Sequence, residues 1–430
     1  MSSEQSGHGE VVGTVQSRIL VGTMGLVAAQ ALTSAAGYFY WLAAAHAYGA
    51  REIGLSASVT SLSIVISLVC GQAFVASALV RLPRCANQRG VILGGSALGG
   101  SAAAVLGMVA VTVIPVVIPP LALVRHAVVA IAVVVICTSQ TVGAFCDGAA
   151  IATGQVKVLV WRNGVFGVGK LALTGLLIVV GERNGPDVLL GAWAITGALT
   201  SGAALWWLAR ATRGSRWELH VLRGGLGPQA VASVAGSVPP QLLPALVVAQ
   251  VGTTMGGYFS LTWLLGGLCF SISPAVCQAM LPTDRKRLGS ATRFAVRLIA
   301  LSLLVPVLLF VFFARPVLDV FGAGYGRYGA GLLLVLGLSA LPDAATNIAV
   351  ARWRIEERLR LAALMNGVIA AVALGLATTV FAAGRSGLVG IGYAWLCGEL
   401  VGCGLWMLIA RSRSPARGRV GFGGLFGRAP

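Results

Sequence analysis

Apolar stretches alternate with short polar segments along the whole chain. Each stretch reaches the roughly 17 to 25 residues that an α-helix needs to cross the apolar core of a membrane. The stretches cover residues 19–45, 55–80, 91–117, 121–150, 164–181, 188–208, 229–251, 257–281, 294–313, 329–351, 361–383 and 388–410. The pattern therefore predicts an all-α polytopic membrane protein with about twelve transmembrane helices.

The longest polar connection divides these stretches into two sets of six. It covers residues 210–228 and separates a first lobe at 18–209 from a second lobe at 229–410. The two halves are weakly similar, because ALVRLP ends the second stretch and QAMLP ends the eighth, each before a basic loop. Internal repeats of this kind are common in transporters. We therefore expect two six-helix lobes joined by a linker.

Basic residues fall mainly on one side of the predicted membrane. The chain has 31 Lys and Arg residues against 13 Asp and Glu, and a net charge of +18. Most of these cations lie in the connections on the same side as the polar segment 1–17, which marks that side as cytoplasmic. We expect both ends of the chain there, with the basic tail at 411–430 near anionic lipid head groups. The charge thus indicates a membrane partner and no nucleic acid.

No motif for catalysis or energy conversion accompanies the apolar pattern. Only 10% of the residues are charged, whereas a soluble domain carries roughly 25%, and no long polar segment could form a soluble catalytic domain. The sequence has no phosphate-binding GxxxxGK[ST] loop and no CxxC pair, and its four histidines are scattered. We expect no enzyme, no catalytic residue, no metal and no cofactor.

Four charged residues lie inside apolar stretches, where a charge usually faces a partner or a watery cavity. Asp147 lies near the cytoplasmic end of the fourth stretch and Lys170 about two turns into the fifth from the same side, so the two side chains are expected at similar depth. A structural ion pair between them is the simpler interpretation. Alternatively, Lys170 lines a cavity and binds an anionic head group.

The other two buried charges, Asp343 and Glu399, lie in stretches without internal Lys or Arg. A buried carboxyl without a cation favours its neutral form, which suits a proton-linked carrier and equally an inert, hydrogen-bonded residue. Pro342 precedes Asp343, so we expect a broken helix there that offers backbone groups to the carboxyl. Asp147, Asp343 and Glu399 are therefore candidates for ion coupling or for structural buried charges.

Seven short segments follow one another in the order and spacing of a known transporter family. They are GYFYWLA at 37–43, YGAREIGL at 48–55, ALVRLP at 78–83, GGYF at 256–259, PAVCQAML at 274–281, VFGAGY at 320–325 and LVGIGYAW at 388–395. In these segments the chain resembles the polysaccharide (O-antigen type) flippases of the multidrug/oligosaccharidyl-lipid/polysaccharide (MOP, MATE-like) exporter superfamily. The resemblance covers nearly the whole chain.

This resemblance implies two lobes around a central cavity and export by alternating access across the bacterial cytoplasmic (inner) membrane. The implied substrate is a polyprenyl-diphosphate-linked oligosaccharide or polysaccharide precursor, with membrane lipids and the glycosyltransferases or polymerase of the same pathway as partners. Cavity cations bind the diphosphate in that family, which puts forward Lys170, Arg81 and Arg297 as substrate-binding residues. The lipid II flippases of the superfamily usually have two further spans, which this sequence does not contain.

Two other functions fit the same pattern. An ion-coupled multidrug (MATE-type) efflux transporter has a similar number of spans, and its cavity would be acidic, with Asp343 or Glu399 at its centre. A non-transporting membrane scaffold of an envelope-polymer assembly complex is the third alternative. The charge of the cavity separates the two kinds of carrier.

Overall fold

The protein is all-helical in this computed structural model, which describes residues 33–182, 184–214, 228–280, 288–382 and 387–412. Within these ranges, 11 helices are long and apolar enough to cross a membrane. Helices suit this environment because they satisfy every backbone hydrogen bond within one segment. Each predicted stretch from the second to the twelfth coincides with one of them. The predicted first span, 19–45, lies partly outside the described residues, which begin with a helix at 33–47.

The first lobe contains the helix at 33–47 and five further long helices. These are α2 (Ala50–Arg81), α3 (Gln88–Val117), α4 (Ala127–Ala152), α5 (Val156–Val179) and α6 (Gly185–Ala211), with short 3₁₀ turns η1 (Leu82–Arg84) and η2 (Pro119–Arg125). The helix α5 begins eight residues before the predicted start at 164. The difference arises because Arg162 lies inside the helix, where an ion pair satisfies its charge.

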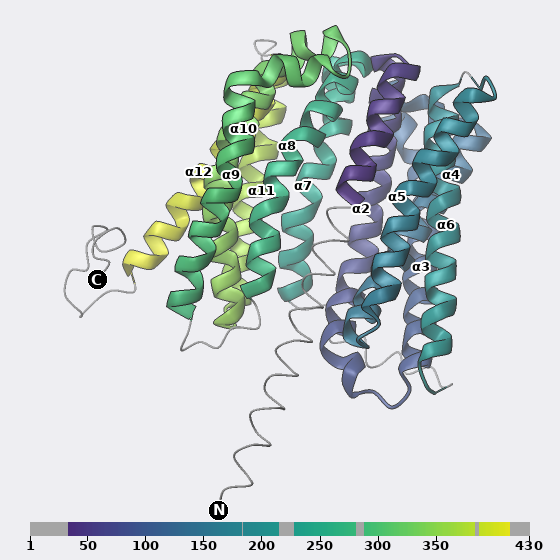
Figure 1. The fold of residues 1–430 in the computed structure, drawn as a ribbon, viewed down its shortest axis with the longest axis vertical. Coiled ribbons are helices and arrows are strands. Elements are labelled where there is room, and N and C mark those ends of the chain that lie inside the picture. Colours follow the sequence, from purple (N-terminus) through teal and green to yellow (C-terminus); the bar gives the residue numbers. More distant parts are fainter. Residues whose placement is uncertain (1–32, 183, 215–227, 281–287, 383–386, 413–430) are drawn as a thin grey trace, which may run out of the picture.

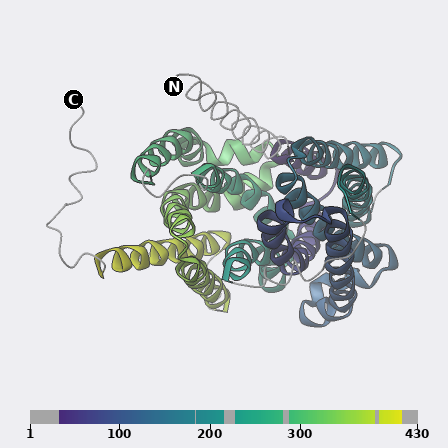
Figure 2. The same cartoon turned by 90° about the horizontal axis from the view of Figure 1, so that it is seen from below.

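The second lobe contains six helices, which lie beside the first lobe in both views (Figures 1 and 2). They are α7 (Pro228–Val251), α8 (Thr253–Met280), α9 (Leu288–Asp319), α10 (Ala323–Ile355), α11 (Leu359–Ala382) and α12 (Leu388–Ser412). The expected break at Pro342 was wrong, because α10 continues through it as one helix. The predicted tail at 1–17, about two thirds of the linker at 210–228 and almost all of the tail at 411–430 lie outside the described residues.

The two ends of the helix bundle differ in charge. One end, at the bottom of Figure 1, contains the C-terminal ends of α2, α4, α6, α8 and α10 and residues such as Arg81, Arg89 and Arg358. We call it the basic end. The other end carries the loop before α2 and the connections between α5 and α6, α7 and α8, and α9 and α10. We call it the opposite end.

The lobes meet closely at the opposite end, where the start of α2 packs against the start of α8. A Cβ atom at Gly54 would collide with the carbonyl oxygen of Thr253, and one at Gly257 would collide with the carbonyl oxygen of Ala50. Only glycine lets two helix backbones approach so closely. Deeper in the same contact, the Ser58 hydroxyl donates a hydrogen bond of 3.1 Å to the carbonyl oxygen of Pro244. These contacts tie α2 to both α7 and α8.

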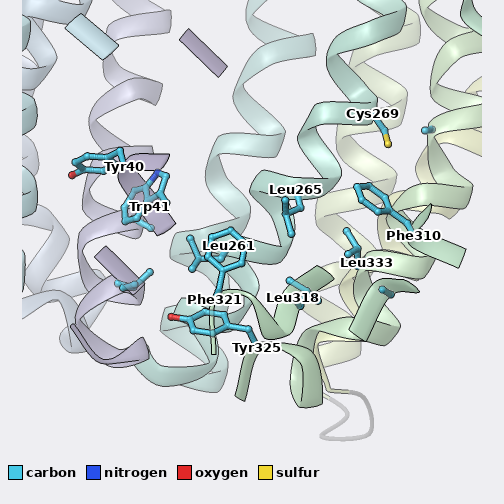
Figure 3. Close-up of a cluster of buried hydrophobic side chains, with 14 of the residues drawn as sticks. Tyr40, Trp41, Leu261, Leu265, Cys269, Phe310, Leu318, Phe321, Tyr325 and Leu333 are labelled. Atoms are coloured by element: carbon cyan, nitrogen blue, oxygen red, sulfur yellow. The ribbon is translucent and has the colours of Figure 1, made fainter. Parts of the chain in front are cut away.

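A buried apolar cluster extends this contact between the lobes (Figure 3). Tyr40 and Trp41 contribute to it from the helix at 33–47, and Leu261, Phe321 and Tyr325 contribute from the second lobe. The rings of Tyr38 and Phe321 meet edge to face, with centroids 5.4 Å apart. Burying this apolar surface favours the arrangement in which the opposite end is closed.

Candidate functional site

A cavity of about 520 Å³ lies among the helices of the second lobe and reaches Gln72 of α2 in the first lobe. This volume falls in the range of small-molecule sites in proteins. Its wall combines aromatic side chains with polar ones, among them Ser233, Ser237, Gln241, Trp263, Phe270, Asn347, Asn366 and Trp395. It also contains three charged residues, Asp343, Arg354 and Glu399. The cavity therefore suits a molecule with both apolar and charged parts.

One face of α10 supplies much of this wall. Asp343, Thr346, Asn347, Val350 and Arg354 all line the cavity, and their spacing of three to four residues keeps them on one side of the helix. The carboxyl of Asp343 begins this stripe at the deep end. The guanidinium of Arg354 ends it, about 16 Å farther along the helix axis and close to the basic end. The cavity is therefore acidic at its floor and cationic toward the basic end.

Asp343 is held by uncharged donors. The hydroxyl of Ser273 on α8 donates a hydrogen bond of 2.8 Å to Oδ2 of Asp343. Asn347 donates to Ser273 Oγ at 3.1 Å and to the backbone oxygen of Asp343 at 3.0 Å. Asp343 is 8% exposed, and within the described ranges it forms no ion pair. The network fixes the carboxyl and leaves its charge without a protein cation.

Glu399 meets the same network from α12. The hydroxyl of Thr346 lies 2.8 Å from Oε2 of Glu399 and 2.9 Å from the backbone oxygen of Asp343. Because this hydroxyl has one proton, it donates to one of these oxygens at a time. A protonated Glu399 could instead donate to Thr346, while Thr346 donates to Asp343. The network is thus able to hold Glu399 in either protonation state.

Two donors on the cavity wall have no acceptor in the described part of the chain. One is the indole N–H of Trp395, one turn before Glu399 on α12, and the other is Nε of Arg354. Buried donors are normally hydrogen-bonded, so these two are unsatisfied groups of residues that line the cavity. Arg354 was not singled out from the sequence. Its spacing from Asp343 along one helix face was the signal that could have identified it.

The predicted pair between Asp147 and Lys170 was wrong, because Asp147 pairs with Arg162. Nε of Arg162 donates to Oδ1 of Asp147 at 2.8 Å, and its terminal nitrogen contacts Oδ2. Asn163 donates a weaker bond of 3.3 Å to Oδ2. Since α5 begins at Val156, Lys170 lies about four turns into it, too deep to reach the end of α4.

Lys170 is instead enclosed by aromatic rings in the first lobe. Its Nζ lies 4.0 Å from the ring centroid of Trp193, 4.9 Å from that of Phe166 and 5.0 Å from that of Tyr40. The residue is 3% exposed and has no ion pair within the described ranges. Ring faces stabilise a cation. Lys170 does not line the cavity of the second lobe.

The other two predicted substrate-binding residues lie away from this cavity. Arg81, in the last turn of α2, and Arg297, on α9, are both exposed and are not among the residues that line it. The structure therefore brings Asp343 and Glu399 together and does not bring Lys170, Arg81 and Arg297 to one site. Trp263 and Trp395 on the wall were not predicted, because an aromatic residue in an apolar stretch gives no sign of which face it occupies.

Comparisons with known proteins identify the fold. No protein-family model matches the sequence, and no curated protein matches it. Among solved structures, the chain is similar to an inward-facing MATE-family multidrug resistance transporter of the MOP superfamily. The TM-score is 0.71 at 14% identity, over 89% of this chain and 94% of that one. The chain has the fold of the MOP-superfamily transporters.

Two further structures refine this comparison. The lipid II flippase MurJ, in an inward closed conformation, gives a TM-score of 0.73 at 10% identity, over 91% of this chain and 87% of that one. An outward-facing MATE-family transporter gives 0.60 at 14% identity, over 92% of this chain and 95% of that one. Of these three comparisons, the TM-scores against the two inward conformations are higher than the one against the outward-facing structure.

Proposed function

We propose that this protein is an ion-coupled transporter that exports an amphipathic molecule by alternating access. One observation carries the proposal: Asp343 and Glu399 line the same cavity of a MOP-type fold, and neither has a cationic partner in the described ranges. A carboxyl buried in a membrane protein is costly unless it has a functional or structural partner. A bound proton or sodium ion would neutralise one of the two carboxylates and remove their mutual repulsion.

Ion binding would act on the packing of three helices. Asp343 on α10 is joined to α8 through Ser273 and to α12 through Thr346 and Glu399. Loading a cation removes the repulsion between the two carboxyls, and unloading restores it. A ligand shifts a conformational equilibrium only by its difference in affinity for the two states. The proposal therefore requires the two carboxyls to bind the cation more tightly in one state of the lobes.

The direction of transport follows from the charge of the two ends. We infer that the basic end faces the cytoplasm, because Lys and Arg concentrate on that side of membrane proteins. The close contact through Gly54 and Gly257 would then seal the external side. This conformation is the one that loads substrate from the cytoplasm. Both termini would be cytoplasmic, and the membrane would be the bacterial inner membrane.

The substrate we favour is a lipid-linked oligosaccharide or polysaccharide precursor. The resemblance of the sequence to polysaccharide flippases and the similarity of the fold to MurJ support it. The buried cation of Lys170 also supports it, because its ring enclosure borders the seal between the lobes and would become accessible when that seal opens. Lys170 is then a candidate to hold an anionic head group on the external side.

Efflux of amphipathic cations is the second candidate. The acidic floor of the cavity and the aromatic rings of Trp263, Phe270 and Trp395 on its wall favour it, because cations bind both carboxylates and ring faces. A non-transporting scaffold has no evident need for two buried carboxyls beside a cavity.

The test measures transport of each substrate class in proteoliposomes with an imposed pH or sodium gradient. The wild type should translocate a polyprenyl-diphosphate oligosaccharide, and the rate should rise with the gradient. The double variant Asp343→Asn, Glu399→Gln should lose this response. If the wild type instead moves ethidium and leaves the lipid-linked oligosaccharide in place, the second candidate is correct. If it moves neither substrate under any gradient, the transport proposal is wrong.

A further inference from the structure

We propose that Arg354 forms an anion-binding site at the cationic end of the cavity, which takes the phosphate head group of the amphipathic substrate. The inference rests on the proposed transport function and specifies the first contact of the substrate. The second lobe would then contain two separate sites, the ion-binding carboxyls of Asp343 and Glu399 and a site for the substrate head group at Arg354. The sequence prediction had placed the head-group cations elsewhere, at Lys170, Arg81 and Arg297.

The position of Arg354 carries the first part of the argument. Its side chain lines the cavity, and its Nε is buried without an acceptor in the described part of the chain. Glu356 pairs with Arg358 at 3.4 Å, and Asp343 lies about three turns deeper on the same helix, so neither of these acids satisfies this donor. The guanidinium of Arg354 is partly exposed and keeps an unused donor, so it is able to bind an anion that enters the cavity.

The surroundings of Arg354 suit a phosphate group. A guanidinium presents a planar fork of N–H donors that matches two phosphate oxygens, and it stays charged at any physiological pH. Ser233 and Ser237, one turn apart on α7, contribute hydroxyls to the same wall. Both serines lie in the first half of α7, toward the basic end. Arg354 lies in the last turn of α10, which points toward the same end of the bundle. Arginine and hydroxyl donors together form a common phosphate site.

The polarity of the cavity would orient the ligand. A phosphate at Arg354 keeps its distance from Asp343 and Glu399, whose charges repel an anion when no cation is bound. The uncharged part of the ligand would then extend along Trp263 and Trp395, toward the floor. A free phosphate ion has no such part, so the site should prefer an amphiphile. This preference distinguishes an amphiphile with a phosphate head group from a free phosphate ion, although both offer the same phosphate group.

The experiment measures binding to the purified full-length protein in a neutral detergent, by isothermal titration calorimetry. The probes are dodecyl phosphate, inorganic phosphate and dodecyltrimethylammonium. The variants are Arg354→Gln, Arg354→Lys and, as a matched control, Arg360→Gln, which removes an exposed cation beyond the end of the same helix. Circular dichroism and thermal unfolding confirm that each variant is folded before binding is measured.

The wild type should bind dodecyl phosphate at least tenfold more tightly than inorganic phosphate. Arg354→Gln should weaken this affinity about tenfold or more, since one charge-assisted hydrogen bond is worth that factor. Arg354→Lys should retain part of the affinity, and Arg360→Gln should match the wild type. The inference is overturned if Arg354→Gln binds dodecyl phosphate as the wild type does, or if Arg360→Gln weakens it equally. Equal affinity for inorganic phosphate, or tighter binding of dodecyltrimethylammonium, also overturns it.

This result is independent of the coupling test. Binding of dodecyl phosphate at equilibrium needs no ion gradient, so it can fail while the response to a gradient depends on Asp343 and Glu399. In that case the head-group site is wrong and the transport proposal stands. If binding depends on Arg354 but no substrate is translocated under any gradient, the transport proposal is wrong and the anion site remains.

Discussion

Asp343 and Arg354 lie on one face of α10, about three helical turns apart, and line the same cavity. This separation prevents them from neutralising each other as a close ion pair. Each charge therefore remains available to a different ligand, a cation at Asp343 and an anion at Arg354. A single helix thus gives the cavity its two electrostatic ends.

Ion coupling should depend on both carboxyls. We predict that Asp343→Asn alone and Glu399→Gln alone each reduce the gradient-driven rate at least tenfold, because a single remaining carboxyl binds a cation more weakly. Binding of dodecyl phosphate should change by less than about threefold in the same variants. Transport in proteoliposomes and calorimetry measure the two quantities. Asp319→Asn, an exposed acid at the end of α9, is the control. Gradient-driven rates that match the wild type would contradict the coupling role.

The pair of Asp147 and Arg162 should be a structural element. Asp147→Asn leaves the Arg162 guanidinium, 7% exposed, without its anion, and should lower the free energy of unfolding by about 3 kcal/mol. The double variant Asp147→Asn, Arg162→Met should recover most of this loss. The exposed pair of Arg315 and Asp319, at 3.9 Å, is the matched control, and Asp319→Asn should cost under about 1 kcal/mol. Unfolding measured in detergent tests this, and equal losses at the two pairs would refute the prediction.

These residues illustrate how much could be predicted from the sequence. Apolar length predicted the membrane character and the 11 spans within the described residues, because the membrane imposes a minimum span. Burial of Lys170, Asp343 and Glu399 followed as well, because their stretches are long and otherwise apolar, whereas Asp147 is only partly buried. Their partners did not follow. The predicted start of α5 was about two turns too late. The calculated depth of Lys170 was therefore wrong, and Arg162 was placed outside the helix, so its pairing with Asp147 was not predicted.

The cavity was harder to predict for a related reason. Sequence gives the position of a residue along a helix more readily than the neighbour that its side chain faces. Asp343 and Glu399 come from different helices, and their connection through Thr346 depends on how α10 packs against α12. Arg354 was not predicted as a cavity residue, because a cation near the end of a span normally indicates the cytoplasmic side of the membrane. Only the fold shows that it lines the cavity.

The contact between Gly54 and Gly257 should control opening of the opposite end. We predict that Gly257→Val forces α8 away from α2, because its side chain would collide with the backbone of Ala50. Overpacking of this kind costs about 1 to 3 kcal/mol. The variant should therefore raise the rate at which an impermeant thiol reagent labels Ser58→Cys, a buried position behind this contact, by about tenfold.

The labelling requires a background without the native cysteines. Gly191→Val is the control, because a Cβ atom at Gly191 has no neighbour within 4 Å. Equal labelling of position 58 in the Gly257→Val, Gly191→Val and parent proteins would contradict the role of this contact.

Lys170 should be dispensable for stability. Its ammonium contacts ring faces and has no anion in the described ranges, so Lys170→Met should leave the free energy of unfolding within about 1 kcal/mol of the wild type. If Lys170 holds the head group on the external side, the same variant should lose transport at least tenfold. A loss of stability of about 3 kcal/mol would instead assign Lys170 a structural role.

The most direct test of the account is the leaflet distribution of the lipid-linked glycan in bacteria that carry this gene. Depletion of the protein should leave the polyprenyl-diphosphate glycan on the cytoplasmic leaflet, protected from a periplasmic glycosidase. Wild-type protein should restore its exposure, and so should Asp319→Asn. The double variant Asp343→Asn, Glu399→Gln should not restore it, although it is inserted at the same level. An unchanged distribution after depletion would contradict the proposal that this protein exports a lipid-linked glycan.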